Sequence, residues 1–358
     1  MKKKFLSNLP RWQKIVIIIL LVLILLVLGV AAAFFILRAS GKGKLYAGAD
    51  SNGPKLEEIA ESESVEEDDG YEYQEGDISY NNHVYRYNSD ILTFLILGID
   101  SNDPVPLAGS TTDYLNGGQS DAIFLAVMNP HDKNFSIVAI NRNTMADVDM
   151  YDSANQYIRT AQAQICVQHG YGDGRELSCE RAEQAVSKLM YDLPIHGYFS
   201  IRYGAIPVLN DSVGGVDVKA AWDIPELGLT AGQTTHLVGQ QAVTFVRERG
   251  EAFDSATGRL NNEKAYLSAF MKKVFDATKA DATFPIQMYN MVSDYIMTDI
   301  SVDKMTYLAS ELLEYSVKDA KMYSIPGETI MGSKYEEFYV YDIGLKEQIL
   351  NIFYDVVK

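Results

Sequence analysis

Three charged residues in the first half of the chain stand where apolar runs begin or end. The runs are Ile91–Ile99, Ala122–Met128 and Phe135–Ile140. Asp100 follows the first run, Asp121 precedes the second, and Arg142 comes shortly after the third. Uninterrupted apolar runs of this length are typical of strands that are buried on both faces.

The turn residues 129–133 favour an antiparallel hairpin of the second and third runs, which brings Asp121 to Arg142. Asp100 joins them if the first strand is antiparallel to the second, although the long loop between these strands permits other arrangements. Two carboxylates beside an arginine suit a divalent cation and a bound phosphate. Aspartate is also common at strand ends, so the pattern alone leaves open that Asp100 and Asp121 are ordinary turn residues.

Three more arginines gather later in the chain, at Arg247, Arg249 and Arg259. The first two are separated by one residue, so their side chains point the same way in an extended segment. Guanidinium groups bind diphosphate oxygens in a bidentate manner, which lysine does poorly. Arg259 opens an expected helix over residues 259–277, where its charge opposes the helix dipole unless an anion is near. Surface ion pairs, for instance with Glu248, are the alternative interpretation.

The composition narrows the classes of function. The formal net charge of the 358 residues is -17, which opposes nucleic-acid binding because a phosphate backbone requires a basic surface. The five histidines show no metal-ligand spacing. Cys166 and Cys179 are the only cysteines. They exclude a cysteine-rich zinc site, and they leave open either a disulfide outside the cell or two free buried thiols.

The N-terminal region predicts a membrane anchor. Residues 1–14 are basic and are expected to form a cytoplasmic tail, and residues 15–37 are uncharged and long enough for a transmembrane helix. A cleaved signal peptide is the alternative, but its apolar core is normally only about 7–15 residues long. Residues 38–84 are acidic and poor in apolar residues, which predicts a flexible linker. Residues 85–358 then form an extracellular domain of a single-pass protein of the cell membrane.

Five motifs follow one another along the chain. They are FLILGID (94–100), QSDAIFLAVMNP (119–130), SIVAINRNT (136–144), VLNDSVGGVDV (208–218), and LVGQQAVTFVRER with GRL (237–249 and 258–260). In this order, behind an N-terminal anchor, they resemble the LytR-CpsA-Psr family of membrane-anchored cell-envelope transferases. The resemblance is clear over roughly residues 88–276 and fainter in the tail.

The resemblance implies a fold and an activity. The fold is an α/β/α sandwich around a mixed sheet, with an apolar pocket for a polyprenyl chain and an arginine-lined mouth for its diphosphate and Mg²⁺. The activity is a phosphotransfer that moves a glycopolymer from a polyprenyl-diphosphate carrier to peptidoglycan or another cell-wall acceptor. Asp100 and Asp121 match the acids near the metal. The residues that match the family's substrate-binding and catalytic arginines are Arg142, Arg247, Arg249 and Arg259.

The chain departs from the family pattern at a few positions. Gln119 and Asn262 stand where arginines are usual, Asn143 stands where a carboxylate is frequent, and Glu263 stands where glutamine is common. These departures motivate an alternative function, a non-catalytic polyprenyl-diphosphate binder or scaffold of the cell envelope. A role in transcription, suggested by part of the family's historical name, is opposed by the acidic charge and the anchor.

Overall fold

The structure of the protein is a computed structural model. It describes residues 11–47, 53–56, 72–108, 117–250, 253–281, 283–315 and 320–358, with the side chains of 11–27 and 30 outside the description. By its internal contacts the chain divides into two units, residues 1–47 with 301–310, and residues 48–300 with 311–358.

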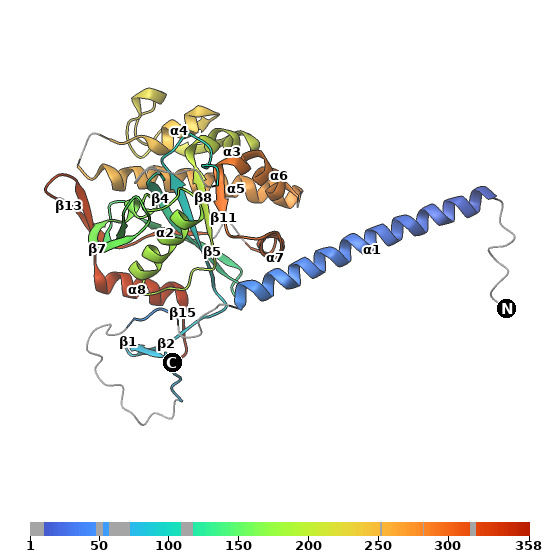
Figure 1. Ribbon diagram of the computed structural model, residues 1–358, viewed down its shortest axis with the longest axis horizontal. Helices are drawn as coiled ribbons and strands as arrows, with labels where there is room; N and C mark the ends of the chain where they lie inside the picture. The colour runs from blue at the N-terminus through green and yellow to red at the C-terminus, as the bar shows by residue number, and fades with distance from the viewer. Residues whose placement is uncertain are drawn as a thin grey trace. The chain divides into compact units, whose positions relative to one another are not determined.

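A six-stranded sheet in the order β11-β8-β3-β4-β5-β12 forms the centre of the larger unit (Figure 1). Its strands are β3 (Leu92–Ile99), β4 (Ser120–Asn129), β5 (Asn134–Ile140), β8 (Tyr198–Arg202), β11 (Ile296–Thr298) and β12 (Lys321–Ser324). The pairs β3–β4, β4–β5 and β8–β11 are antiparallel, whereas β3–β8 and β5–β12 are parallel. The predicted mixed sheet is therefore confirmed, as is the antiparallel placement of the first strand against the second.

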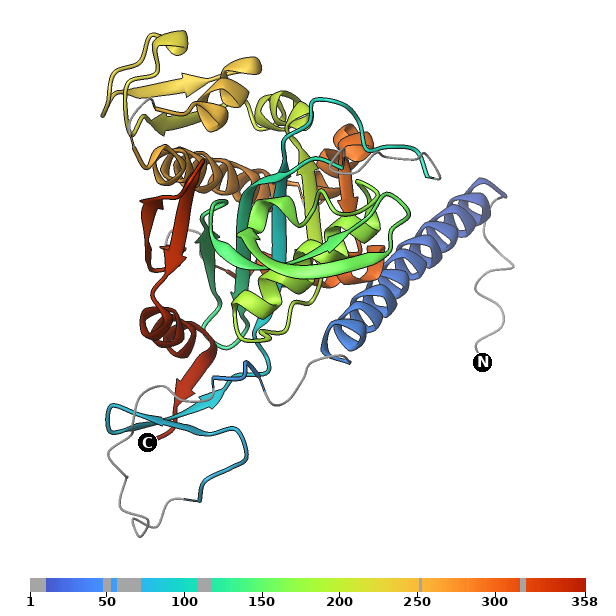
Figure 2. The same ribbon diagram turned by 60° about the vertical axis from the view of Figure 1, so that its left-hand side comes forward.

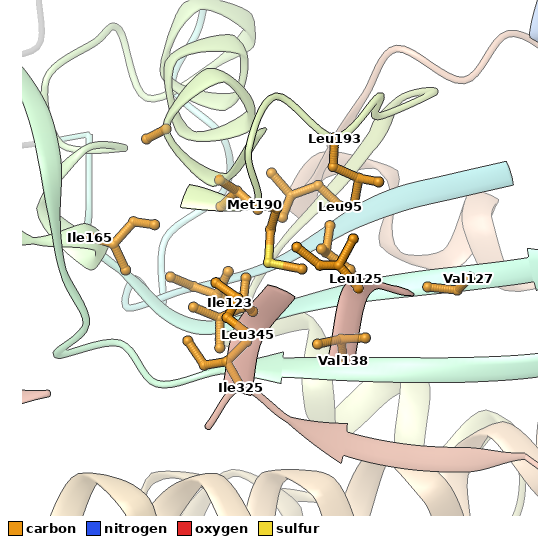
Figure 3. Close-up of a cluster of buried hydrophobic side chains, with 14 of the residues drawn as sticks. Leu95, Ile123, Leu125, Val127, Val138, Ile165, Met190, Leu193, Ile325 and Leu345 are labelled. Carbon is orange, nitrogen blue, oxygen red and sulfur yellow. The ribbon is translucent and has the colours of Figure 1, made fainter. Parts of the chain in front are cut away.

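Alternate residues of β3 face opposite layers of the unit, as the period of a strand requires. Leu95 and Leu97 are fully buried against α2 (Glu176–Leu189) and α8 (Asp342–Phe353). Figure 3 shows this core, in which Leu95 lies near Met190 at the end of α2.

The intervening residue Ile96 points to the other face, where it meets a cavity lined by α5 (Ser255–Ala280). Helical layers therefore cover both faces of the sheet, as the sandwich prediction requires.

Shorter elements complete the larger unit (Figure 2). The helices are α3 (Ile206–Ser212), α4 (Gln240–Arg247) and α6 (Phe284–Val292), with 3-10 turns at Ile165–Val167, Tyr203–Ala205, Pro225–Leu227 and Ser293–Tyr295. The small antiparallel sheets are β1 (Ile78–Tyr80) with β2 (His83–Tyr87) and β15 (Tyr354–Val356), β6 (Met145–Tyr151) with β7 (Tyr157–Gln164), β9 (Val216–Lys219) with β10 (Thr234–Leu237), and β13 (Gly327–Met331) with β14 (Glu336–Val340).

Helix α5 begins at Ser255, earlier than the sequence predicted. Gly258 therefore lies inside the helix. The ring of Trp222 packs so closely against it that a Cβ atom there would be 2.4 Å from that ring, which accounts for a glycine at this position. Arg259 consequently sits beyond the first turn, so the predicted conflict with the helix dipole is wrong at this position. Its charge must be compensated by side chains instead.

The smaller unit consists of α1 (Arg11–Tyr46) and residues 301–310, which hold most of α7 (Val302–Leu312). Asp303 accepts a hydrogen bond of 2.7 Å from Ser40 and pairs with Lys44 at 2.6 Å. The predicted flexible linker, residues 38–84, differs from the structure at both ends: residues 38–46 belong to α1, and residues 78–80 and 83–84 lie in strands β1 and β2. Residues 48–52 and 57–71 of it lie outside the described residues.

The anchor predicted over residues 15–37 falls largely on side chains that the structure does not describe. In the part of the chain that it does describe, no helix has both the length and the hydropathy of a membrane span. The anchor stays a prediction from the sequence.

Candidate functional site

The strand ends that the sequence predicted to meet share one edge of the central sheet. Asp100 directly follows β3, Asp121 is the second residue of β4, and Arg142 comes shortly after β5. The pairing of Ile99 with Ser120 and the antiparallel β4–β5 pairing fix this placement. Arg142 Nε lies 2.9 Å from Asp121 Oδ1, as an ion pair without hydrogen-bond geometry. The predicted juxtaposition is confirmed.

Asp121 is the centre of a cluster of guanidinium groups. Its Oδ2 atom accepts hydrogen bonds from Arg259 Nη1 at 2.9 Å and from Arg249 Nη2 at 3.5 Å. The Asp121 backbone carbonyl accepts another from Arg259 Nη2 at 3.3 Å. The Arg259 side chain is only 4% exposed, against 17% for Asp121. One carboxylate thus orients arginines from three separate segments, since Arg142 binds its other oxygen.

Arg247 and Asp100 form the outer, more exposed part of the cluster. Arg247 Nη2 donates a hydrogen bond of 2.9 Å to Asp100 Oδ1, and the two side chains are 48% and 37% exposed. The Arg247 guanidinium also lies over the ring of Tyr203, 4.3 Å from its centroid, in a cation–π contact. This stacking holds the exposed guanidinium at the rim, where a ligand would enter.

Burial lowers the pKa of Arg249, and the nearby positive charges of Arg259 and Arg142 lower it further. The carboxylates of Asp121 and Asp100 act in the opposite direction. The cluster therefore holds more positive charge than its own carboxylates neutralise. An anion bound among these side chains would relieve the repulsion.

An apolar cavity of about 160 Å³ opens beside the charged cluster. Its mouth includes Asp100, Asp121, Arg247 and Arg259. Its apolar walls come from both the sheet and the covering helices: Ile96, Phe124, Ile201, Ile206, Leu209, Val246, Tyr266, Leu267 and Phe270. The cavity therefore has arginines at its mouth and apolar side chains inside, which suits a molecule with an anionic head and an apolar tail.

Glu263 lies in the cavity wall between the arginines and the apolar interior. Its Oε1 atom is 3.3 Å from Arg259 Nε, and the residue is 8% exposed. Burial raises the pKa of Glu263 to about 7, and the positive charge of Arg259 offsets part of that effect. In the sequence, Glu263 stood out only as a departure from the glutamine that is common at this position, and it was given no role of its own. A second local signal was its spacing from Arg259, one helical turn further along α5.

The two cysteines are free and buried, so the disulfide alternative is wrong and the free-thiol alternative holds. Cys166 Sγ accepts a hydrogen bond from Arg142 Nη2 at 3.1 Å. Burial raises the pKa of Cys166, and it raises that of Cys179 to about 12. Within the described ranges, no group of three or more His, Cys, Asp or Glu side chains gathers in a way that would hold a metal ion by itself.

Comparison with known proteins decides the family. The sequence profile of the LytR_cpsA_psr family matches residues 55–355. The chain belongs to this family. It is 25% identical over 240 residues to the polyisoprenyl-teichoic acid–peptidoglycan teichoic acid transferase TagU of Enterococcus faecalis, covering 66% of this chain and 71% of that one. Across the first curated relatives it matches, the chain spans 54% to 71% of their length.

Solved structures of the LytR_cpsA_psr type share the fold. TagV of Bacillus subtilis superposes with a TM-score of 0.53 at 18% identity, over 73% of this chain and 95% of that chain. A structure described as TagT bound to LI-WTA superposes with a TM-score of 0.54 at 20% identity, over 74% of this chain and 91% of TagT. At these identities the likeness shows the fold and does not settle the substrate.

Two of the departures from the LytR_cpsA_psr pattern, Gln119 and Asn262, form local hydrogen bonds through their side chains. Gln119 accepts a short hydrogen bond from Arg142, so it fixes an arginine of the cluster. Asn262 is completely buried and bonds the backbone of Ala221 and Phe245 at 3.2 and 3.4 Å. Asn143 is also buried. An arginine at position 262 would therefore have to enter packed protein, and the amide there has a structural role.

Proposed function

We propose that this protein is a phosphotransferase that moves a glycopolymer from a polyprenyl-diphosphate carrier to peptidoglycan or another cell-wall acceptor. The observation that carries the proposal is the meeting of Arg142, Arg247, Arg249 and Arg259 with two aspartates at the mouth of an apolar cavity. Four arginines that share only two aspartates, in a chain of net charge -17, support an anionic ligand at this point. The transferase names of its relatives support the same class of reaction.

The arginines supply the electrostatic part of the mechanism. A diphosphate at the mouth would exchange its oxygens for the carboxylate oxygens that now bind the guanidinium groups. Arg259 and Arg142 are held by Asp121 in a buried position, so they are oriented before the ligand arrives. Preoriented donors stabilise the charge that develops on phosphoryl oxygens during transfer.

The residues present fit a magnesium ion of the kind that substrate phosphates complete. Magnesium is usually held by one or two carboxylates together with phosphates and water. Asp100 is the better candidate, because among the described residues its carboxylate is bound by Arg247 alone, whereas both oxygens of Asp121 are engaged by arginines. The ion would supply charge neutralisation on the diphosphate.

The apolar cavity would take the start of the polyprenyl chain. Its walls are aliphatic and aromatic below the charged mouth, so burial of isoprene units there is favourable by the hydrophobic effect. We place the domain outside the cell, on an uncleaved N-terminal anchor, since residues 15–37 are long and apolar enough.

Turnover tests the proposal directly. The full-length protein, purified in detergent with Mg²⁺, a polyprenyl-diphosphate-linked glycan and cell-wall fragments, is expected to release lipid phosphate and to label the wall. Arg247→Ala should lower kcat/KM about tenfold or more, because charge-assisted hydrogen bonds contribute roughly 1.5–3 kcal/mol. Arg159→Ala, an exposed arginine of β7, is the matched control and should leave turnover unchanged.

A non-catalytic lipid binder remains the second candidate. The observation that favours it is that Asp121 is saturated by arginines and that an amide, Asn143, stands where a carboxylate is frequent in the family. This candidate predicts a lipid diphosphate that copurifies with the protein, identified by mass spectrometry, without any turnover. Turnover that Arg247→Ala abolishes would exclude it.

A further inference from the structure

Glu263 has an unusual position for a glutamate. It lines the cavity on α5, one turn after Arg259 and next to the apolar side chains of Tyr266 and Leu267. Its Oε1 atom lies 3.3 Å from Arg259 Nε, which is an ion-pair distance, and the Arg259 side chain is itself buried. A carboxylate in such a wall costs free energy unless it is well paired. A buried carboxyl group at this position therefore requires a functional explanation.

The charged groups around Glu263 come from every neighbouring segment of the site. Arg259 lies one turn earlier on the same helix, Asp121 comes from β4, Arg142 follows β5, and Arg249 follows α4. The arginines favour the ionised carboxyl, while Asp121 and burial favour the neutral one. The balance lies close to neutral pH, so small changes in local charge decide whether the proton is present.

We propose that Glu263 carries a proton when the ligand binds, and that its acid form donates a hydrogen bond to the phosphate nearest the lipid chain. This inference rests on the proposed function, because it takes the mouth to hold a lipid-linked diphosphate. The position fits: along α5, Glu263 comes one turn after Arg259 and one turn before Leu267, and all three line the cavity. The phosphate nearest the lipid chain would have to lie at this point between charged and apolar side chains.

The physical reason is charge. An ionised Glu263 repels the phosphate oxygens, whereas the carboxylic acid is a donor to them. Binding then takes up a proton whenever the free protein has lost it. Because burial puts the pKa of Glu263 at about 7 in the free protein, affinity should fall about tenfold between pH of about 6 and about 8, provided the bound form keeps its proton throughout.

The probe is a farnesyl diphosphate esterified with a sugar. Both phosphates are then esterified, so the charge of the ligand is constant across this pH range and only the protein titrates. Binding to the full-length protein in detergent is measured by calorimetry without metal ions. Wild type should bind about tenfold more weakly at the higher pH and should take up close to half a proton at about pH 7.

Glu263→Gln supplies the comparison, since the amide keeps the shape and can donate but does not titrate. Its affinity should be the same at both pH values. Glu248→Gln is the matched control, because Glu248 stands between Arg247 and Arg249 in the sequence but does not line the cavity. That variant should keep the pH dependence of wild type.

The outcomes separate the two proposals. A flat profile in wild type, or a Glu263→Gln profile that parallels it, would overturn the role of Glu263 while leaving the proposed function standing. No binding of the probe by wild type at either pH would overturn both. Proton uptake is measured on wild type in buffers of different ionisation enthalpy, so the test holds even if the variant fails to fold.

Discussion

Replacing Glu263 by glutamine should stabilise the fold at high pH and not at low pH. Burial raises the pKa of Glu263 to about 7 from an ordinary value of 4.5, so the folded state holds a proton that the unfolded state has lost over that interval. The stability that this group contributes is therefore fully present below about pH 4.5 and is lost as the pH rises to about 7. An amide does not titrate and escapes the loss.

The magnitude follows from the two pKa values. The difference between a pKa of 4.5 in the unfolded chain and about 7 in the folded protein corresponds to roughly 3 kcal/mol of lost stability once Glu263 is fully ionised, at about 1.4 kcal/mol for each pKa unit. Most of that loss occurs between about pH 5 and about pH 8. The stability of Glu263→Gln relative to wild type should then rise by about 2.5 kcal/mol across this interval. Other titrating groups cancel in the difference between the two proteins.

Urea unfolding of the full-length proteins at both pH values, followed by circular dichroism, measures this difference. Glu176→Gln is an informative control, because a hydrogen bond from its own backbone N–H and then the Arg175 side chain lower the pKa of Glu176. Loss of this carboxylate should therefore destabilise the fold at the higher pH. A Glu263→Gln variant that gains no stability between the two pH values would refute the placement of this carboxyl in a water-poor wall.

Four further outcomes follow from the same geometry. Arg259→Ala should weaken inorganic diphosphate binding about 10- to 100-fold in calorimetry, and unchanged affinity would remove Arg259 from the site. Leu267→Trp, which fills the cavity, should weaken binding of farnesyl diphosphate about tenfold but leave binding of inorganic diphosphate unaffected. Equal effects on both ligands would show that the lipid chain does not occupy the cavity. Asn262→Arg should destabilise the protein by about 3 kcal/mol in urea, because Asn262 is completely buried, and a neutral result would show room for a guanidinium there. Thiol alkylation without reductant should label Cys166 and Cys179 only after unfolding, since both are buried and free, and thiols that stay unlabelled in the unfolded chain would indicate a disulfide.

The meeting of charged residues at one edge of the sheet was predictable, because the directions of neighbouring strands follow from the apolar runs and the length of the turn between them. Apolar runs gave β3, β4 and β5, and a short turn made the last two antiparallel. Once direction is known, Asp121 and Arg142 must share an edge. The later arginines were placed by resemblance, because Arg249, which follows α4, and Arg259 on α5 reach β4 only through packing that no local pattern encodes.

Other features were missed for identifiable reasons. The β6–β7 hairpin, over residues 145–164, is mostly exposed on β7 and alternates weakly, so its strands lack the apolar signal of the core. In the sequence, Leu267 and Phe270 of α5 fit an ordinary buried helix face, yet in the structure they line the cavity. A helical stripe looks the same in sequence whether it meets protein or an empty pocket.

The charge at the mouth indicates how a proton and a metal ion relate in this site. Four guanidinium groups face Asp100 and Asp121, so with Glu263 in its acid form the cluster carries two net positive charges. A diphosphate esterified at both ends carries two negative charges and would leave the cluster neutral, which removes the repulsion among its guanidinium groups. A magnesium ion adds two positive charges, and an ionised Glu263 would offset part of that addition. Either the proton on Glu263 or the metal ion can therefore balance the charge of the bound diphosphate. We expect Mg²⁺ to restore, at high pH, the affinity for the diphosphate that deprotonation of Glu263 removes.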